Sequence, residues 1–213
     1  MTEAYGLSIP DQLSEVCVPA RCAVIIYDMQ KGVVPQISTG AEIVTYCLQL
    51  LEAARAGGYR IFFTRHLFLP NTFAGIGQLR RAMVWQRKRR PEETKPFFLQ
   101  GSPHWEIVPE LEPREGEVVI DKITMSAFEG TFLNLAMRDA RLDSFIIAGI
   151  ALEVGIGPTV RHALDLNFCP VLVSDACGSK TEDLRKQTIA TLEETGEVYV
   201  ASTPDVLSAM RPH

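Results

Sequence analysis

Short apolar runs alternate with longer segments of helical periodicity along most of this 213-residue chain. Runs of this kind, bounded by turn residues, are typical of buried strands. The predicted strands are Cys22–Tyr27, Tyr59–Thr64, Val118–Ile120, Phe145–Ala148, Pro170–Val173 and Glu197–Ala201. The predicted helices are Ala41–Ala56, Thr131–Ala140, Pro158–Asp165, Thr181–Glu194 and Pro204–Met210. Continuously apolar strands separated by helices indicate a doubly wound α/β fold, with a six-stranded, mostly parallel sheet and helices on both faces.

The segment from Leu67 to Arg114 breaks this alternation, because it is proline-rich and holds few strand signals. Only Gln78–Gln86 has a helical pattern within it. A connection of this length inside a compact domain is usually functional. We therefore expect one domain, residues 1–213, in which residues 67–114 form a lid or an oligomer contact.

Composition and charge exclude several classes of protein. Apolar content of 46%, charged content of 22% and a net charge of −5 are globular values that argue against a general nucleic-acid binder. No apolar run approaches the roughly 18 residues of a membrane span, and residues 1–10 do not have the pattern of a signal peptide. The five cysteines include no Cys-x-x-Cys pair, so free thiols in a cytoplasmic protein are expected.

Two predicted strands run directly into ionisable residues. Asp28 follows Cys22–Tyr27, and Lys122 follows Val118–Ile120 after one further residue. Because the carboxyl ends of parallel strands meet at one edge of a sheet, both side chains are expected at one site. A buried carboxyl beside an ammonium suits proton transfer, although a helix cap for Asp28 and a solvated Lys122 are the simpler alternatives.

The turn after the fourth predicted strand is a third candidate. Gly157-Pro158 has the pattern of a helix start, so the backbone N–H groups of Gly155, Ile156 and Gly157 are candidates for binding an oxyanion or carboxylate. Glu153 in this apolar turn needs a partner. It either binds a substrate hydroxyl or water, or forms a salt bridge with a residue such as Arg161.

His66 and the arginine-rich segment Gln78–Arg90 could each be functional or merely structural. His66 follows the second predicted strand, but its neighbours supply no second ligand, so no metal is expected there. The segment Gln78–Arg90 is rich in arginine. It is either a solvated basic face or the source of one arginine that pairs with a substrate carboxylate.

Five stretches, taken together and in this order, resemble the isochorismatase-like hydrolases, also called the cysteine hydrolase superfamily. They are Val24–Gln30, Val119–Phe128, Ala148–Gly155, Thr159–Ala163 and Val173–Cys177.

The resemblance implies an Asp–Lys–Cys triad in which Asp28 and Lys122 match the first two positions, while Gly155 stands where the cysteine belongs. A glycine cannot form the covalent intermediate of a thiol. The isochorismatases proper also carry glycine there and hydrolyse a vinyl ether, although they have histidine where this chain has Glu153. The resemblance also implies a non-proline cis peptide near Ala151-Leu152.

We therefore expect a hydrolase that acts on a small anionic molecule by acid-catalysed enol-ether hydrolysis, without a cofactor. The alternatives are amide or imide hydrolysis by activated water, and a ligand-binding or scaffold protein without turnover. A homodimer or homotetramer is expected. Besides Asp28, Lys122 and Gly155, the expected substrate-binding residues are Glu153, Leu152, Ile156, Gln78, Trp85, Arg87 and Phe128.

Overall fold

The computed structural model describes residues 1–196 and 198–211 and contains a six-stranded parallel sheet with strand order β5-β4-β3-β6-β7-β8. The strands of this sheet are β3 Cys22–Tyr27, β4 Arg60–His66, β5 Val118–Lys122, β6 Ser144–Ile150, β7 Cys169–Gly178 and β8 Tyr199–Ala201. Every neighbouring pair runs parallel. The order reverses between β3 and β6, and this switch point is where open α/β sheets bind ligands.

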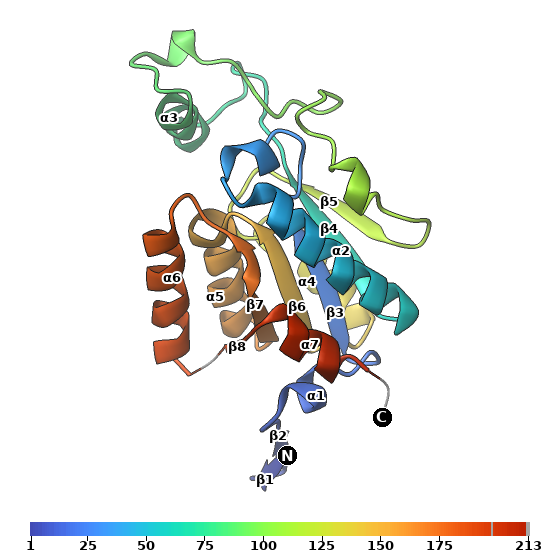
Figure 1. The fold of residues 1–213 in the computed structure, drawn as a ribbon. Coiled ribbons are helices and arrows are strands. Elements are labelled where there is room, and N and C mark those ends of the chain that lie inside the picture. The colour runs from blue at the N-terminus through green and yellow to red at the C-terminus, as the bar shows by residue number, and fades with distance from the viewer. Residues whose placement is uncertain (197, 212–213) are drawn as a thin grey trace.

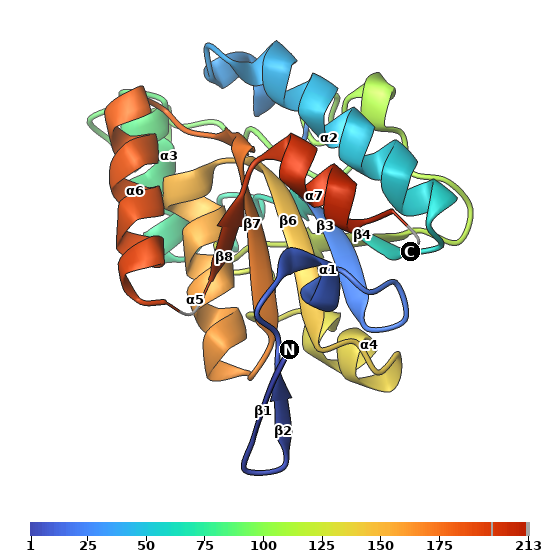
Figure 2. The ribbon, with the colours of Figure 1, turned by 60° about the horizontal axis from the view of Figure 1, so that its bottom comes forward.

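Helices cover both faces of the sheet (Figures 1 and 2). The helices described are α1 Leu13–Val16, α2 Gly40–Ala56, α3 Ile76–Trp85, α4 Leu133–Asp139, α5 Gly157–Asp165, α6 Glu182–Glu194 and α7 Thr203–Ala209, of which α3 lies beyond the carboxyl end of the sheet rather than on a face. One apolar core lies between the sheet and α2 and α7, and a second lies between the sheet and α4, α5 and α6. The predicted doubly wound fold is therefore confirmed.

The predicted strands are present, but several extend further than their apolar runs. β4 continues to His66 and β7 to Gly178, because these residues still pair with a neighbouring strand, His66 with Lys122 of β5 and Gly178 with Ile150 of β6. Glu197, the predicted start of the last strand, lies outside the described residues. The sequence pattern also missed a short hairpin, β1 Thr2–Ala4 and β2 Leu7–Ile9, which lies at the opposite end of the molecule from α3 (Figures 1 and 2).

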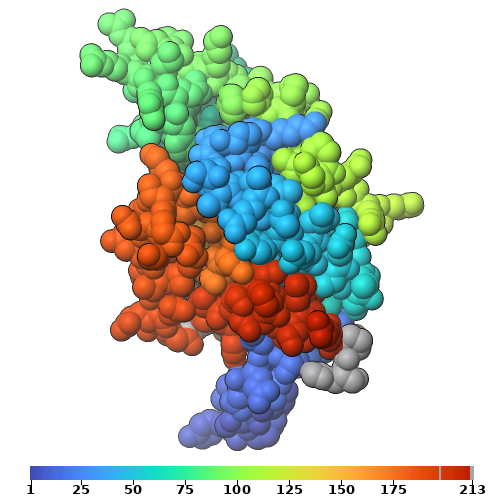
Figure 3. Space-filling view, in the orientation of Figure 1, coloured from blue at the N-terminus to red at the C-terminus, as the bar shows by residue number. Residues whose placement is uncertain are grey.

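The long segment after β4 forms a separate lobe at the carboxyl end of the sheet (Figure 3). It contains α3 and two 3₁₀ turns, η2 Pro91–Glu93 and η3 Pro109–Leu111. Buried Gln30 connects this lobe to the sheet, because its amide donates to the carbonyls of His66 and Trp105 and accepts from the N–H of His66. None of the helices described is both long and apolar enough to cross a bilayer.

Candidate functional site

Asp28 and Lys122 form a buried ion pair at the carboxyl edge of the sheet. Lys122 Nζ lies 2.7 Å from Asp28 Oδ2, so the two strand-end residues pair as expected. Thr64, on the strand between them, donates its hydroxyl to Asp28 Oδ1 at 2.6 Å. Asp28 has a φ of +47°, a left-handed conformation that aspartate tolerates better than most residues. This turn ends β3 beside the switch point.

Burial pulls both members of the pair toward their neutral forms. Asp28 is 6% exposed and Lys122 is 2% exposed. Loss of solvent raises the pKa of Asp28, while the Lys122 ammonium and the Thr64 hydroxyl oppose that rise. Loss of solvent also lowers the pKa of Lys122, against the attraction of Asp28. A carboxyl group in this environment is suited to give or accept a proton.

The imidazole ring of His66 lies beside this pair. It is 4% exposed, it is aligned with Lys122 in the register of β4 and β5, and neither ring nitrogen has a partner among the described residues. The aromatic rings of Phe68, Trp85 and Phe98 lie edge-on around the imidazole, where a metal site would have further ligands. Burial, with the nearby charges of Lys122 and Arg81, lowers the pKa of His66 to about 3.

The lowered pKa of His66 predicts an acid-dependent loss of stability. In the unfolded chain this histidine takes up a proton below about 6.5, whereas the folded protein resists protonation down to about 3. Stability is therefore fully present above pH 6.5 and falls by about 1.4 kcal/mol per pH unit below it, or about 2 kcal/mol at pH 5. Urea unfolding of His66→Gln from pH 5 to 8 should lack this slope. His104→Gln, at an exposed histidine, should retain it.

An open pocket of about 680 Å³ lies on the far side of the loop after β5. Neither Asp28 nor Lys122 lines it, but Lys122 Nζ donates at 3.3 Å to the carbonyl of Thr124, which belongs to its wall. Its walls come from the loop after β4, the first half of α3, the loop after β5 and one face of α5. The lining residues are Leu69, Gly75, Gly77, Gln78, Arg81, Ile123, Thr124, Met125, Ser126, Glu129, Pro158, Arg161, His162 and Asp165. This volume is typical of a small-molecule site.

The sequence interpretation missed the contribution of α5 to this pocket. Pro158, Arg161, His162 and Asp165 are spaced at i, i+3, i+4 and i+7, which places them on one helical face. This polar face was a usable signal. His162 Nδ1 lies 3.0 Å from Ser126 Oγ, which connects α5 to the loop after β5.

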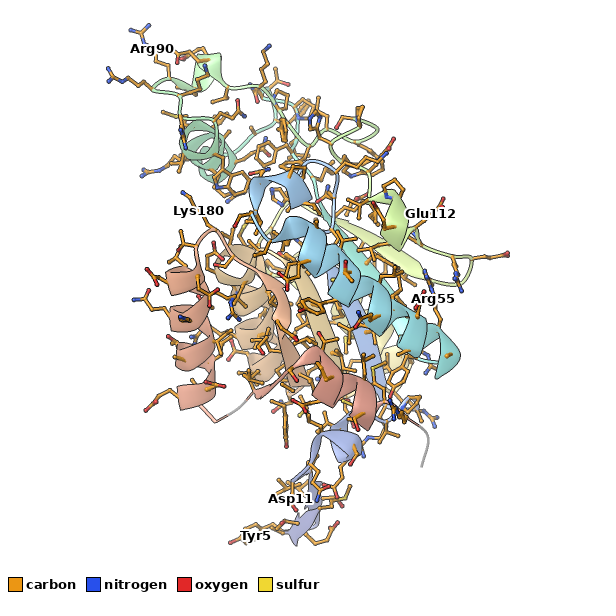
Figure 4. All side chains as sticks on the ribbon, viewed as in Figure 1. Tyr5, Asp11, Arg55, Arg90, Glu112 and Lys180 are labelled. Carbon is orange, nitrogen blue, oxygen red and sulfur yellow. The ribbon has the colours of Figure 1, made fainter. Side chains whose placement is uncertain are left out.

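Arg81, rather than the expected Arg87, is the arginine of this segment that lines the pocket. Burial lowers its pKa, and its Nε is buried without a partner among the described residues. Arg87 is exposed beyond the end of α3, with a φ of +53°, and Arg90 extends from the far tip of the lobe (Figure 4). The helical turn places Arg81 on the inner face of α3 and directs the later basic residues outward.

The other two expected residues of this lobe have different places. Gln78 lines the pocket, although its amide is bonded to the backbone N–H and carbonyl of Leu69. Trp85 stacks on Phe68 and contacts the ring of His66, is 42% exposed, and is not among the described residues that line the pocket.

The turn after β6 is a π-helical turn, η4 Leu152–Ile156, and its backbone does not present the expected anion site. The N–H groups of Gly155 and Ile156 donate to the Ala151 carbonyl, and that of Gly157 donates to Leu152. The cis peptide lies one bond earlier than expected, between Ile150 and Ala151.

Glu153 does not contact the pocket walls. Its carboxylate accepts from Ser179 Oγ at 2.6 Å and from the Lys180 N–H at 3.1 Å, and no bond to Arg161 is present in the described residues. It therefore holds the loop after β7 against η4.

The remaining expected residues are in the core. Leu152 and Ile156 are fully buried, and Phe128 is stacked on Phe168, so apolar packing rather than substrate contact explains them. Gly155 is also buried, beneath the ring of Tyr27. These residues support the site from below.

The cysteines are not placed as nucleophiles. Burial raises the pKa of the Cys22, Cys47 and Cys177 thiols, and it raises that of Cys169 to about 11. Cys177 lies after the fifth predicted strand, Pro170–Val173, but in the structure it is fully buried within β7. Thiols held in the neutral form are poor nucleophiles.

Comparison with known proteins agrees with this fold. Residues 22–205 match the family described as Isochorismatase domain. The chain is 26% identical to the isochorismatase family protein YwoC of Bacillus subtilis, over 79% of this chain and 84% of that protein. It is 23% identical to the ureidoacrylate amidohydrolase RutB of Pseudomonas savastanoi pv. phaseolicola, over 91% and 85% of the two chains.

A crystal structure of a cysteine hydrolase from Pseudomonas syringae pv. phaseolicola 1448A has the same fold, with a TM-score of 0.76 and 23% identity over 90% of this chain and 93% of that one. An isochorismatase family protein from Desulfovibrio vulgaris superposes with a TM-score of 0.74 at 25% identity, covering 88% and 98%. The family match spans most of the sequence and both halves of the sheet. The chain therefore belongs to the isochorismatase domain family of hydrolases.

Proposed function

We propose that this hydrolase cleaves a small carboxylate-bearing enol ether by proton transfer from Asp28, without a cysteine nucleophile. The observation that carries the proposal is the buried Asp28–Lys122 pair, with the Asp28 pKa raised by burial and a glycine at position 155. A carboxyl group that keeps its proton at higher pH than a free aspartate is a competent general acid.

The chemistry needs a proton and a water but no covalent intermediate. The Asp28 carboxyl gives its proton to the terminal carbon of the enol, which leaves an oxocarbenium ion at the ether carbon. Water adds to that carbon, and the resulting hemiketal collapses to a carbonyl product and an alcohol. Lys122 stabilises the Asp28 carboxylate formed in the first step. The proton lost by the attacking water restores the acid.

A carboxylate on the substrate would meet Arg81, one of two arginines that line the pocket in the described part of the chain, the other being Arg161. Arg81 lines the pocket and is half-buried, its Nη2 donates to the Ile123 carbonyl at 3.4 Å, and its Nε is buried without a partner among the described residues. A guanidinium with free donors gains from a bidentate carboxylate partner. His66, neutral and also unpaired, lies close enough to Arg81 for that charge to lower its pKa.

Arg81→Gln should weaken substrate binding more than it slows chemistry. We expect KM to rise about 10- to 100-fold, in line with the loss of one charge-assisted pair, with a smaller change in kcat. Arg87→Gln is the matched control, because that side chain is exposed and outside the pocket. Equal effects of the two substitutions would contradict the assignment of Arg81.

Thiol reagents should leave turnover intact. Because burial keeps Cys22, Cys47 and Cys177 neutral, iodoacetamide should react slowly with the folded protein and should not inactivate it. Activity is measured after treatment, and modified thiols are mapped by mass spectrometry. Inactivation that tracks Cys177 and is blocked by substrate would rule out the thiol-free mechanism.

Hydrolysis of an amide by activated water is the second candidate, supported by the similarity to the RutB ureidoacrylate amidohydrolases. Here Asp28 would act as a base toward water. A panel of isochorismate, chorismate, ureidoacrylate and simple carboxylate amides separates the candidates. Release of a carbonyl product from the enol ethers supports the first, and release of ammonia or an amine supports the second. Saturable binding without turnover would support a ligand-binding protein instead.

A further inference from the structure

The side-chain space at position 155 is already filled by Tyr27. A Cβ atom built on Gly155 would lie 2.5 Å from both Cε1 and Cζ of Tyr27 and closer still to its hydroxyl oxygen. Real Cβ atoms do not approach other atoms so closely. The backbone of Gly155 is not left-handed, so conformation alone does not require glycine there. The neighbouring phenol does.

Tyr27 also connects position 155 to the ion pair. It is 1% exposed, and its hydroxyl donates to the carbonyl of Met125 in the pocket wall. The face of its ring lies 4.3 Å from Lys122 Nζ, which favours an ammonium. Lys122 donates in turn to the Thr124 carbonyl at 3.3 Å and to Asp28. The ring, the loop and Asp28 thus enclose the ammonium.

A second link joins the same loop to η4 and α5. Thr159 Oγ1 donates to the Gly155 carbonyl at 2.8 Å and accepts the Ala127 N–H at 2.9 Å. The loop after β5 is therefore held at both ends, by Tyr27 at Met125 and by Thr159 at Ala127.

We propose that Tyr27 and Gly155 form a matched pair, in which the phenol occupies the space of a side chain at 155 and acts as a positioning residue for Lys122. The thiol position is thus closed by Tyr27, and restoring a cysteine at 155 requires a smaller residue at 27. The role of Tyr27 toward Lys122 rests on the proposed function, whereas its pairing with Gly155 does not.

Stability measurements test the pairing without any substrate. Gly155→Ala should lower the melting temperature by more than about 5 °C in the wild-type background, or prevent folding. The same alanine in a Tyr27→Val background should be tolerated, so that Tyr27→Val/Gly155→Ala melts at or above Tyr27→Val. Folding of the double variant keeps the test valid if the single variant does not fold. An equal loss caused by alanine in both backgrounds would overturn the pairing.

The space at 155 is tested chemically by Tyr27→Val/Gly155→Cys. The rate at which iodoacetamide alkylates the introduced thiol should rise with pH. The midpoint of this pH dependence should lie at least about one unit below 8.5, the pKa of a free cysteine. A midpoint at or above 8.5 would show that position 155 does not face the ammonium.

The positioning role is tested by Tyr27→Phe, which retains the ring and loses only the bond to Met125. We expect kcat to fall about 10-fold with KM little changed, and the pH profile of kcat to shift as Lys122 loses its fixed place beside Asp28. An unchanged kcat and pH profile would overturn this role. It would leave the stability coupling of Tyr27 and Gly155 unaffected.

Discussion

Replacing Asp28 by asparagine should reduce kcat/KM about a thousandfold, since general acid catalysis contributes about 10²- to 10⁴-fold. Asparagine has nearly the same shape as aspartate, can accept the Thr64 hydroxyl bond and tolerates a φ of +47°. The fold should therefore persist, which circular dichroism and a cooperative thermal transition can check. In the wild type, kcat/KM should decline as pH rises through the raised pKa of Asp28, because the acid form is then lost.

Asp143→Asn is the matched control for this substitution. Asp143 forms an exposed pair with Arg21 at the amino-terminal end of β6, away from the pocket. Its replacement should leave kcat/KM unchanged. Full activity in Asp28→Asn, or an equal loss in both variants, would remove Asp28 from the mechanism.

Lys122→Met should have the second largest effect, on stability as well as activity. Removing one member of a buried ion pair costs about 3–5 kcal/mol, because the remaining charge is left without compensation. The folded-state pKa of Asp28 would rise further. A group with a raised folded-state pKa contributes stability at low pH and loses that contribution as pH rises through the folded-state value. The difference in unfolding free energy between the wild type and Lys122→Met should therefore grow from pH 5 to pH 8.

Urea unfolding of Lys122→Met across this pH range provides the test. Asp28→Asn/Lys122→Met lacks the buried carboxylate, so it should be more stable than Lys122→Met at pH 8 and should show a flatter pH dependence. A loss of unfolding free energy that is the same at every pH would contradict this account. It would mean that methionine disturbs packing and that Asp28 does not depend on Lys122 for its charge.

The fold was predictable from sequence because its strands are buried on both faces. β3 is apolar from Cys22 to Tyr27, and its predicted bounds agree with the structure. Strand ends were less accurate where polar residues continue the strand, as at His66 in β4. The hairpin Thr2–Ile9 was missed because its exposed side chains leave no contrast between a buried and a solvent face.

The ion pair was predictable because parallel strands place their ends together. Of the pocket walls, only Gln78 was predicted, although the polar face of α5 was a usable signal. Which arginine points inward depends on where α3 begins and how it faces the loop after β5, so Arg87 was chosen over Arg81. Leu152 and Ile156 flank the matched position 155, yet they face the core because the π-helical turn rotates them away from the pocket. The contact between Tyr27 and Gly155 joins residues far apart in sequence, and no local pattern indicates it.

The isotopic composition of the product formed in D₂O tests the central claim most directly. With isochorismate or chorismate as the enol ether, the pyruvate released is trapped at once by reduction and analysed by mass spectrometry. Proton transfer from Asp28 to carbon predicts a single solvent deuterium in the methyl group of the product from the wild-type enzyme, with formation of that product lost in Asp28→Asn and retained in Asp143→Asn. Product without solvent deuterium, or turnover confined to amides, would contradict the account.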